Sequence, residues 1–201
     1  MAVTIGAFIV AAVHDGTIDG EGSVSRNLWL FGPSVHNGEW YRMFTASLVH
    51  FGFIHIFFNM LLLWIVGQML EPGTGSLRFA TIYVVSVLSG SAAALLMQPH
   101  VPSGGASGGI FGIAAAATLV MQRRGVRFWD TGLGPLIIIN LFLDFFVFTN
   151  VSIAAHIGGA IGGLLAAEAM LQARKLGRPQ LGLIGAALVT VIAVAVGLAA
   201  V

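Results

Sequence analysis

The chain has 201 residues, of which 57% are hydrophobic and 8% charged, and its mean hydropathy is +0.94. A soluble globular domain carries about 25% charged residues, so this composition excludes a soluble protein and predicts several membrane-spanning helices. The formal net charge of +1 gives no reason to expect nucleic-acid binding, and the lack of cysteine excludes disulfides and thiolate chemistry. The length fits a single membrane domain, residues 1–201, and we expect no cofactor.

The first apolar segment, residues 1–13, is short for a membrane span, because it covers roughly 20 Å of a hydrocarbon core near 30 Å. It has the length of a signal-peptide core, but no basic region precedes it and no small-residue cleavage motif closes it. We therefore predict a short first membrane helix. The polar connection that follows, residues 14–41, is long for a loop and carries aromatic clusters at residues 28–31 and 40–41. Such clusters suit the headgroup level, so part of this loop is predicted to lie in or on the bilayer.

Six further apolar segments follow the first one. They lie at approximately residues 51–70, 79–97, 107–121, 133–148, 151–171 and 181–201. Together with residues 1–13 they predict seven membrane spans, or six if the first segment is absent. The predicted fold class is therefore all-α, a polytopic membrane helix bundle. The last segment, in which Thr190 is the one polar side chain, is predicted to be a plain anchoring helix.

The basic residues indicate how the bundle is oriented. Seven of the nine lysines and arginines fall in alternate loops on one side of the membrane, namely Arg78, Arg123, Arg124, Arg127, Arg174, Lys175 and Arg178. The positive-inside rule makes that side cytoplasmic. We therefore expect a multi-pass protein of the plasma (inner) membrane, with its N-terminus in the cytoplasm and the loop at residues 14–41 outside.

Polar side chains inside apolar spans are candidates for function because burying them in lipid is costly. Ser107 opens the fourth span and follows a glycine-rich turn at residues 103–106. A hydroxyl there would lie at a helix N-terminus, where backbone N–H groups favour a developing anion. His156 lies near the start of the sixth span, which runs in the same direction. In isolation, Ser107 could instead be a simple helix cap and His156 a core histidine.

Small residues predict that the fourth and sixth spans approach each other closely. Gly108 and Gly112 are four residues apart in the fourth span, and Ala155 and Gly159 have the same spacing in the sixth. Stripes of this kind allow close helix packing and would bring a serine and a neighbouring imidazole base together. We therefore predict a Ser–His dyad.

His55 and Asn59 share one face of the second span because they are four residues apart. They are predicted to help the Ser107 backbone N–H stabilise an oxyanion, or else to be polar contacts between helices. His50 lies about 140° from His55 on an ideal helix, so we expect it to face elsewhere and to tie the preceding loop to the second span. One good metal ligand in this segment gives no reason to expect a catalytic metal.

Two charged residues, Arg42 and Asp144, each have two possible roles. Arg42 either braces the loop before the second span or anchors it to lipid phosphates. Asp144 is the acidic residue deep in a span near the outer side, and it either supports a gate or faces water at a loop end. Because no carboxylate is placed to complete a triad, the prediction remains a dyad.

Three spaced motifs resemble the signature of the rhomboid family of intramembrane serine proteases. They are residues 39–42 (EWYR) with His50, His55 and Asn59, residues 105–108 (GASG), and residues 155–163 (AHIGGAIGG). The resemblance implies a six-helix core at about residues 39–172 and an extra C-terminal helix at about residues 181–201. Phe111 stands where some members have a tyrosine, so it could stack on His156 but offers no hydroxyl.

The resemblance also implies roles for the site residues. Ser107 would be the nucleophile and His156 the general base, while His55, Asn59 and the backbone near Gly104 would line the oxyanion hole. Substrates would be transmembrane protein segments that enter laterally from the lipid bilayer past the fifth span and the cap loop beyond it. Cleavage would follow a small residue such as alanine, and the site would open to the non-cytoplasmic side.

Two other functions compete with proteolysis. A non-proteolytic relative could bind or escort membrane proteins, but such pseudoproteases lose the serine or the histidine, and both are present here. A transporter or channel could use the glycine-lined polar cluster, but the two halves of the sequence contain no inverted repeat. The sequence does not indicate an oligomeric state or a particular substrate.

Overall fold

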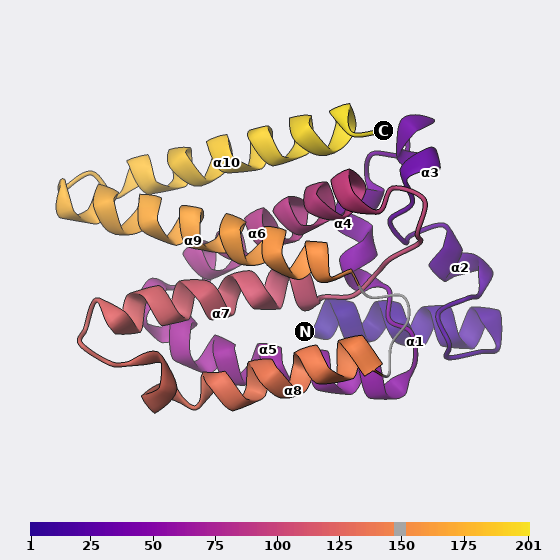
Figure 1. Cartoon of the computed structure of the whole chain (residues 1–201), viewed down its shortest axis with the longest axis horizontal. Helices are drawn as coiled ribbons and strands as arrows, with labels where there is room; N and C mark the ends of the chain where they lie inside the picture. Colours follow the sequence, from indigo (N-terminus) through magenta and orange to yellow (C-terminus); the bar gives the residue numbers. More distant parts are fainter. Residues whose placement is uncertain (147–151) are drawn as a thin grey trace.

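The computed structural model describes residues 1–146 and 152–201, apart from the side chains of residues 143–146. Within these residues the chain folds into a bundle of apolar helices (Figure 1). They are α1 (Ala2–Asp15), α5 (Phe53–Thr74), α6 (Ser76–Met97), α7 (Ser107–Gln122), α8 (Leu133–Phe146), α9 (Ile153–Lys175) and α10 (Gln180–Ala199). This is the all-α membrane bundle that the sequence predicted.

Four of the described helices, α5, α6, α9 and α10, are long and apolar enough to cross a membrane. The helices α1, α7 and α8 are apolar but shorter. All seven correspond in order to the predicted spans. Several run further than their apolar segments, for example α5 to Thr74 and α9 to Lys175, because a helix continues into polar residues that hydropathy does not detect. The expected span ends at residues 148 and 151 lie outside the described residues.

Helix α9 lies at the centre of the packing, against α6, α7 and α10 (Figure 1). Glycines in α9 allow it to pack this closely against its neighbours. A Cβ added at Gly159 would overlap the carbonyl of Gly108, and one at Gly163 would overlap that of Gly112. On the α6 side, a Cβ at Gly158 would lie 2.6 Å from the carbonyl oxygen of Ser89. The backbones therefore touch, as the small-residue spacing predicted.

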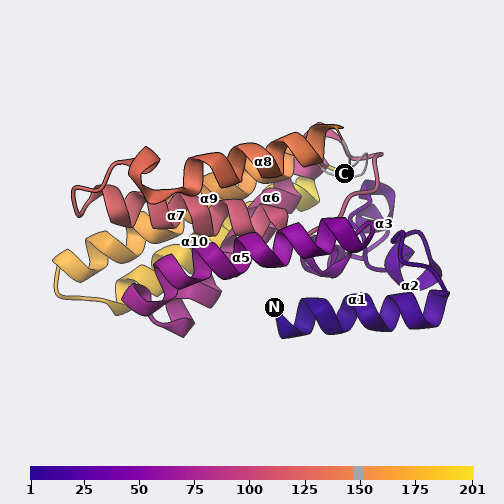
Figure 2. The same ribbon diagram turned by 90° about the horizontal axis from the view of Figure 1, so that it is seen from below.

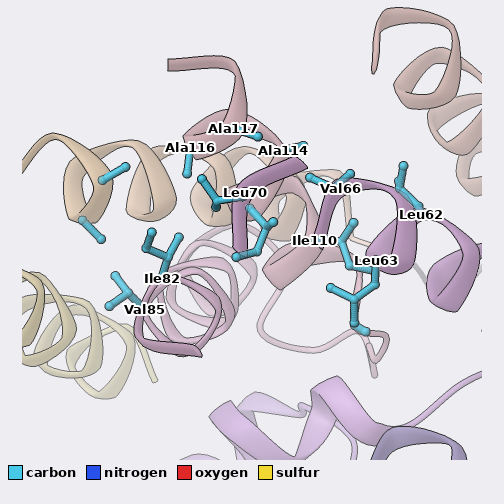
Figure 3. Packing of buried hydrophobic residues seen from close by; sticks show 14 of the residues in the cluster. Leu62, Leu63, Val66, Leu70, Ile82, Val85, Ile110, Ala114, Ala116 and Ala117 are labelled. Atoms are coloured by element: carbon cyan, nitrogen blue, oxygen red, sulfur yellow. The ribbon is translucent and has the colours of Figure 1, made fainter. Parts of the chain in front are cut away.

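A continuous apolar core joins α5, α6 and α7 at the middle of the bundle. Figure 3 shows Leu63 and Val66 of α5 beside Ile110 of α7, with Ile82 of α6 in the same cluster. These side chains are buried, whereas large apolar side chains on the outer faces of α9 and α10, such as Ile157 and Leu188, are exposed. The exposed side chains give the bundle an apolar outer surface.

The segment between α1 and α5, residues 16–52, is called loop 1 here. It contains four short helical segments, α2 (Ser23–Arg26), α3 (Gly32–His36), α4 (Arg42–Thr45) and the 3₁₀ turn η1 (Ala46–Leu48). The sequence predicted a polar connection at residues 14–41 and gave no sign of these segments, because three to five residues are too few to show a helical period. Helix α1 packs on η1 and α2 and lies beside part of α5 (Figure 2).

Candidate active site

Ser107 and His156 meet where α7 and α9 begin. The Ser107 Oγ lies 2.7 Å from the His156 Nε2, and both side chains are buried. Ser107 is the first residue of α7 and His156 the fourth of α9, so the close contact of these two helices brings the side chains together. When the serine hydroxyl donates to Nε2, a neutral imidazole carries its proton on Nδ1. This is the arrangement in which the ring can accept the hydroxyl proton.

Phe111 fixes the plane of the His156 ring. The two ring centroids are 4.4 Å apart and the planes differ by 9°, which is a stacked arrangement. Phe111 lies four residues after Ser107, one turn along α7, so the same helix supplies both the hydroxyl and the ring that covers the imidazole.

The glycine-rich turn before Ser107 is held in place by loop 1. Ser103 and Leu30 form an antiparallel bridge through two backbone hydrogen bonds of 2.8 and 3.0 Å. The Gly105 N–H donates to the Ala46 carbonyl at 2.9 Å, and Gly105 has a φ of +132°, which a residue with a side chain rarely adopts. A Cβ at Gly104 would lie 3.0 Å from the Cβ of Val49. The position of the serine therefore depends on loop 1.

His55, in the first turn of α5, lies beside Gly105 of this glycine-rich turn. The backbone N–H of Phe51 donates to its Nδ1 at 3.2 Å, so the neutral ring carries its proton on Nε2. That nitrogen faces Gly105: a Cβ added there would lie 3.1 Å from the His55 Nε2 and 3.6 Å from the Ser107 Oγ. A donor and the hydroxyl oxygen thus border the same small space.

Asn59 lies one turn further along α5 and is also buried. Its amide nitrogen donates to the His55 carbonyl at 3.0 Å, within the same helix, and it makes no hydrogen bond to Ser107. The second amide hydrogen of this side chain is not used in that bond. The structure therefore brings His55 next to the serine turn, and Asn59 is held one turn further along α5 by its bond to His55.

His50 occupies a position that the sequence did not predict. Its ring centroid is 5.1 Å from that of His55, so the expectation that it faces elsewhere is wrong. The predicted angle of about 140° between His50 and His55 assumed one helix through both residues. It does not apply, because α5 begins at Phe53 and Gly52 has a φ of +103°. The Ala106 N–H donates to the His50 Nε2 at 3.3 Å, which links loop 1 to the serine turn. Burial lowers the pKa of His50 to about 4, so it is neutral at pH 7.

Arg42 braces loop 1 from inside. Its guanidinium is buried, binds the carboxylate of Glu39, and donates to the carbonyl oxygens of Arg26 at 2.6 Å and Trp29 at 3.1 Å. The hydrogen bond from Arg42 holds the pKa of Glu39 below its ordinary value. Of the two roles considered for Arg42, these contacts match the brace. The side chain of Asp144 lies outside the described residues, so both expectations for it stay predictions.

A small cavity of about 30 Å³ borders Ser107. Its walls include Ser47, Ser91, Ser103 and Gly104 together with apolar residues such as Leu30 and Val87. A cavity of this size has room for about one water molecule. The site therefore combines a hydroxyl, an imidazole, an N–H donor and room for water in an otherwise apolar bundle.

The fold agrees with the comparison to known proteins. The family model for the rhomboid domain matches residues 37–173. The chain therefore belongs to the rhomboid family and is an integral membrane protein.

Three relatives show the extent of the similarity. The chain is 39% identical over 190 residues to the rhomboid protease GluP of Bacillus subtilis, covering 90% of this chain and 36% of that one. It is 34% identical over 156 residues to the rhomboid protease GlpG of Enterobacter sp. (strain 638), covering 73% and 54%. It is 32% identical over 138 residues to RHOMBOID-like protein 7 of Arabidopsis thaliana, covering 67% and 44%. The chain thus spans about a third to a half of the length of these relatives.

Proposed function

We propose that this protein is an intramembrane serine endopeptidase that hydrolyses peptide bonds in or near transmembrane segments. The observation that carries the proposal is the 2.7 Å contact between the Ser107 Oγ and the His156 Nε2 at the start of two adjoining helices. Relatives that are named as rhomboid proteases support the same reaction class.

In the first step, the Ser107 Oγ attacks the carbonyl carbon of the scissile bond while the His156 Nε2 accepts the hydroxyl proton. The negative charge that develops on the carbonyl oxygen is stabilised by the backbone N–H of Ser107, which has no partner within its helix, and by the Nε2–H of His55. Asn59 supplies its remaining amide hydrogen. The imidazolium then gives its proton to the leaving amide nitrogen, the C–N bond breaks, and an acyl ester remains on Ser107.

In the second step, water attacks the ester carbonyl and His156 accepts one of its protons. The proton is returned to the Ser107 Oγ as the ester bond breaks, which releases the new carboxyl end and restores the enzyme. Water must reach an apolar bundle for this step, and the cavity of about 30 Å³ beside Ser107 is a place to hold it.

The substrate is proposed to be a membrane-protein helix that enters from the lipid past α8. Support comes from packing: among the described residues, α8 has its main contacts with α5 and with the 3₁₀ turn η2 (Phe128–Thr131), whereas α9 packs against three helices. A loosely packed helix at the edge of the bundle costs less to displace. The site is proposed to open to the non-cytoplasmic side of the plasma membrane, with the N-terminus in the cytoplasm.

A serine-directed fluorophosphonate probe tests the dyad on purified protein in detergent, alongside cleavage of a reporter transmembrane peptide. We expect Ser107→Ala to abolish both labelling and cleavage, and His156→Asn to reduce cleavage about as completely, because the two groups act as a unit. The matched control is Ser76→Ala, since Ser76 is an exposed serine that also opens a helix, α6, but does not border the dyad, and it should be labelled within about threefold of wild type.

Two outcomes would contradict the proposal. Cleavage that survives in Ser107→Ala would place the nucleophile elsewhere. A wild-type protein that is folded but neither labelled nor active would favour the non-proteolytic escort function.

A further inference from the structure

A second cavity lies at the end of the bundle opposite to the dyad. It has a volume of about 690 Å³, which is within the usual range of about 300–1,000 Å³ for ligand pockets. Its walls come from the last turns of α5, α7 and α9 and the first turns of α6. Figure 2 shows α5, α7 and α9 ending at this side of the bundle, where α10 begins.

Four arginines from three helix ends border this cavity. They are Arg78, Arg123, Arg124 and Arg174. Arg123 is paired with a carboxylate, because its guanidinium lies 2.9 Å from both carboxylate oxygens of Glu168. Arg78 donates to the carbonyl oxygen of Thr74 at 3.3 Å. Among the described residues, no carboxylate lies within 4.0 Å of Arg78, Arg124 or Arg174. The cavity therefore has an excess of positive charge.

The helix dipole at one wall adds to this charge. Helix α6 begins at Ser76, directly after its N-cap residue Gly75, and both Gly75 and Arg78 border the cavity. The first N–H groups of a helix have no partner within the helix, and they favour anions. Guanidinium groups and free N–H groups together are the donors that bind phosphate oxygens.

The remaining wall is apolar and lies deeper in the bundle. It is formed by Ile82, Val120, Ala167, Met170 and Leu171. A free phosphate ion would gain nothing from these side chains, whereas a phosphate that is attached to acyl chains would bury apolar surface against them. The arginines stand at the helix ends, where the headgroups of the adjoining leaflet lie.

We propose that this cavity binds the phosphate headgroup of an anionic phospholipid from the leaflet at this end of the bundle, which is the cytoplasmic one in the proposed orientation. The arginines contact the phosphate, and the upper acyl chain packs on the apolar wall. The proposal does not depend on the peptidase activity, because its site shares no residue with the dyad.

Lipid binding to the full-length protein in detergent tests the proposal, with native mass spectrometry as the readout. Phosphatidylglycerol is the probe, phosphatidylcholine is the uncharged comparison and sn-glycerol 3-phosphate is the soluble comparison. The variant is Arg124→Gln with Arg174→Gln. Its matched control is Lys175→Gln with Arg178→Gln, which removes the same charge at the same end of the bundle but from residues outside the cavity.

We expect wild type to retain phosphatidylglycerol in preference to phosphatidylcholine. The cavity variant should lose affinity for phosphatidylglycerol by about 10-fold for each guanidinium and about 100-fold in total, since each makes a charge-assisted hydrogen bond. The control should stay within about threefold of wild type. Thermal unfolding of both variants shows whether they are folded.

Three results would overturn the proposal. Equal losses in the cavity variant and the control would mean that general charge, and not the cavity, binds the lipid. Equal binding of phosphatidylcholine and phosphatidylglycerol by wild type would show that the cavity does not select an anionic headgroup, and this result does not require the variants to fold. Glycerol phosphate binding as tightly as the lipid would assign the site to a soluble phosphate compound instead.

Discussion

The three buried histidines near the serine differ in which nitrogen carries the proton. His55 accepts a backbone hydrogen bond at Nδ1, whereas His50 accepts one at Nε2 from Ala106, and His156 accepts the Ser107 hydroxyl at Nε2. Each contact fixes one tautomer of a neutral ring. His55 is thereby a donor toward the serine turn and His156 an acceptor. The same residue type performs two different tasks because the backbone around each ring differs.

Phe111 is expected to support the reaction by orienting the base. Replacing it with alanine removes the stacked ring at 4.4 Å and should slow cleavage by about 2- to 10-fold, since such ring pairs contribute about 0.5–1.5 kcal/mol. Phe111→Tyr keeps the ring and should cleave within about twofold of wild type. The measurement is kcat on a reporter transmembrane peptide, and equal rates for the alanine and tyrosine variants would show that the stack has no effect.

His50 is expected to make stability dependent on pH. Burial lowers its pKa in the folded state to about 4, below the value near 6.5 of an unfolded chain. Between these values the unfolded state binds more protons, so this contribution to stability is present above pH 6.5 and is lost as the pH falls toward 4. The loss from this residue amounts to about 3 kcal/mol when complete.

Thermal unfolding in detergent between pH 7.5 and pH 4.5 measures this effect. His50→Gln cannot titrate and should show a shallower fall in unfolding temperature than wild type over the same range. The two proteins would show parallel profiles if His50 were solvated or already charged in the folded state.

At the scale of helices, the sequence predicted what depends on local pattern. The order and type of all seven apolar helices follow from hydropathy, and the contact of α7 with α9 follows from the spacing of Gly108, Gly112 and Gly159. Ser107 and His156 could be paired in advance because both stand at the start of helices that run in the same direction.

The contacts of loop 1 could not be predicted in this way. The bridge from Leu30 to Ser103 joins residues far apart in the sequence, and no period or motif marks it. The position of His50 was also missed, because a glycine with positive φ starts the helix later than the apolar pattern suggests. The arginine-lined cavity depends on how four helix ends converge, which a count of basic residues does not reveal.

Gly159 is expected to tolerate no side chain. A methyl group there overlaps the Gly108 carbonyl, so Gly159→Ala should push α9 away from α7. We expect a destabilisation of roughly 1–3 kcal/mol from overpacking, and fluorophosphonate labelling of Ser107 that is about 10²-fold slower because the dyad is displaced. Gly6→Ala is the control, since nothing lies within 4 Å of its added Cβ. Equal labelling of the two variants would show that the dyad does not depend on this contact.

At the scale of the whole molecule, the orientation in the membrane can be tested directly because the chain has no cysteine. Single cysteines can therefore be introduced at exposed positions of the two ends, Asn37→Cys in loop 1 and Lys175→Cys at the end of α9. With a membrane-impermeant maleimide, we expect Asn37→Cys to react in intact cells and Lys175→Cys to react only after permeabilisation. The reverse pattern would invert the proposed topology.

The bridge between Leu30 and Ser103 also has a consequence for biosynthesis. The helices α5 and α6 lie between these residues in the chain, so the serine turn cannot take its final shape until both have been inserted. His156, the proposed base, belongs to α9 and is inserted after both of these helices. A nascent chain that is only partly integrated therefore carries an incomplete site, and under the proposed function it could not cut other proteins emerging at the same translocation machinery.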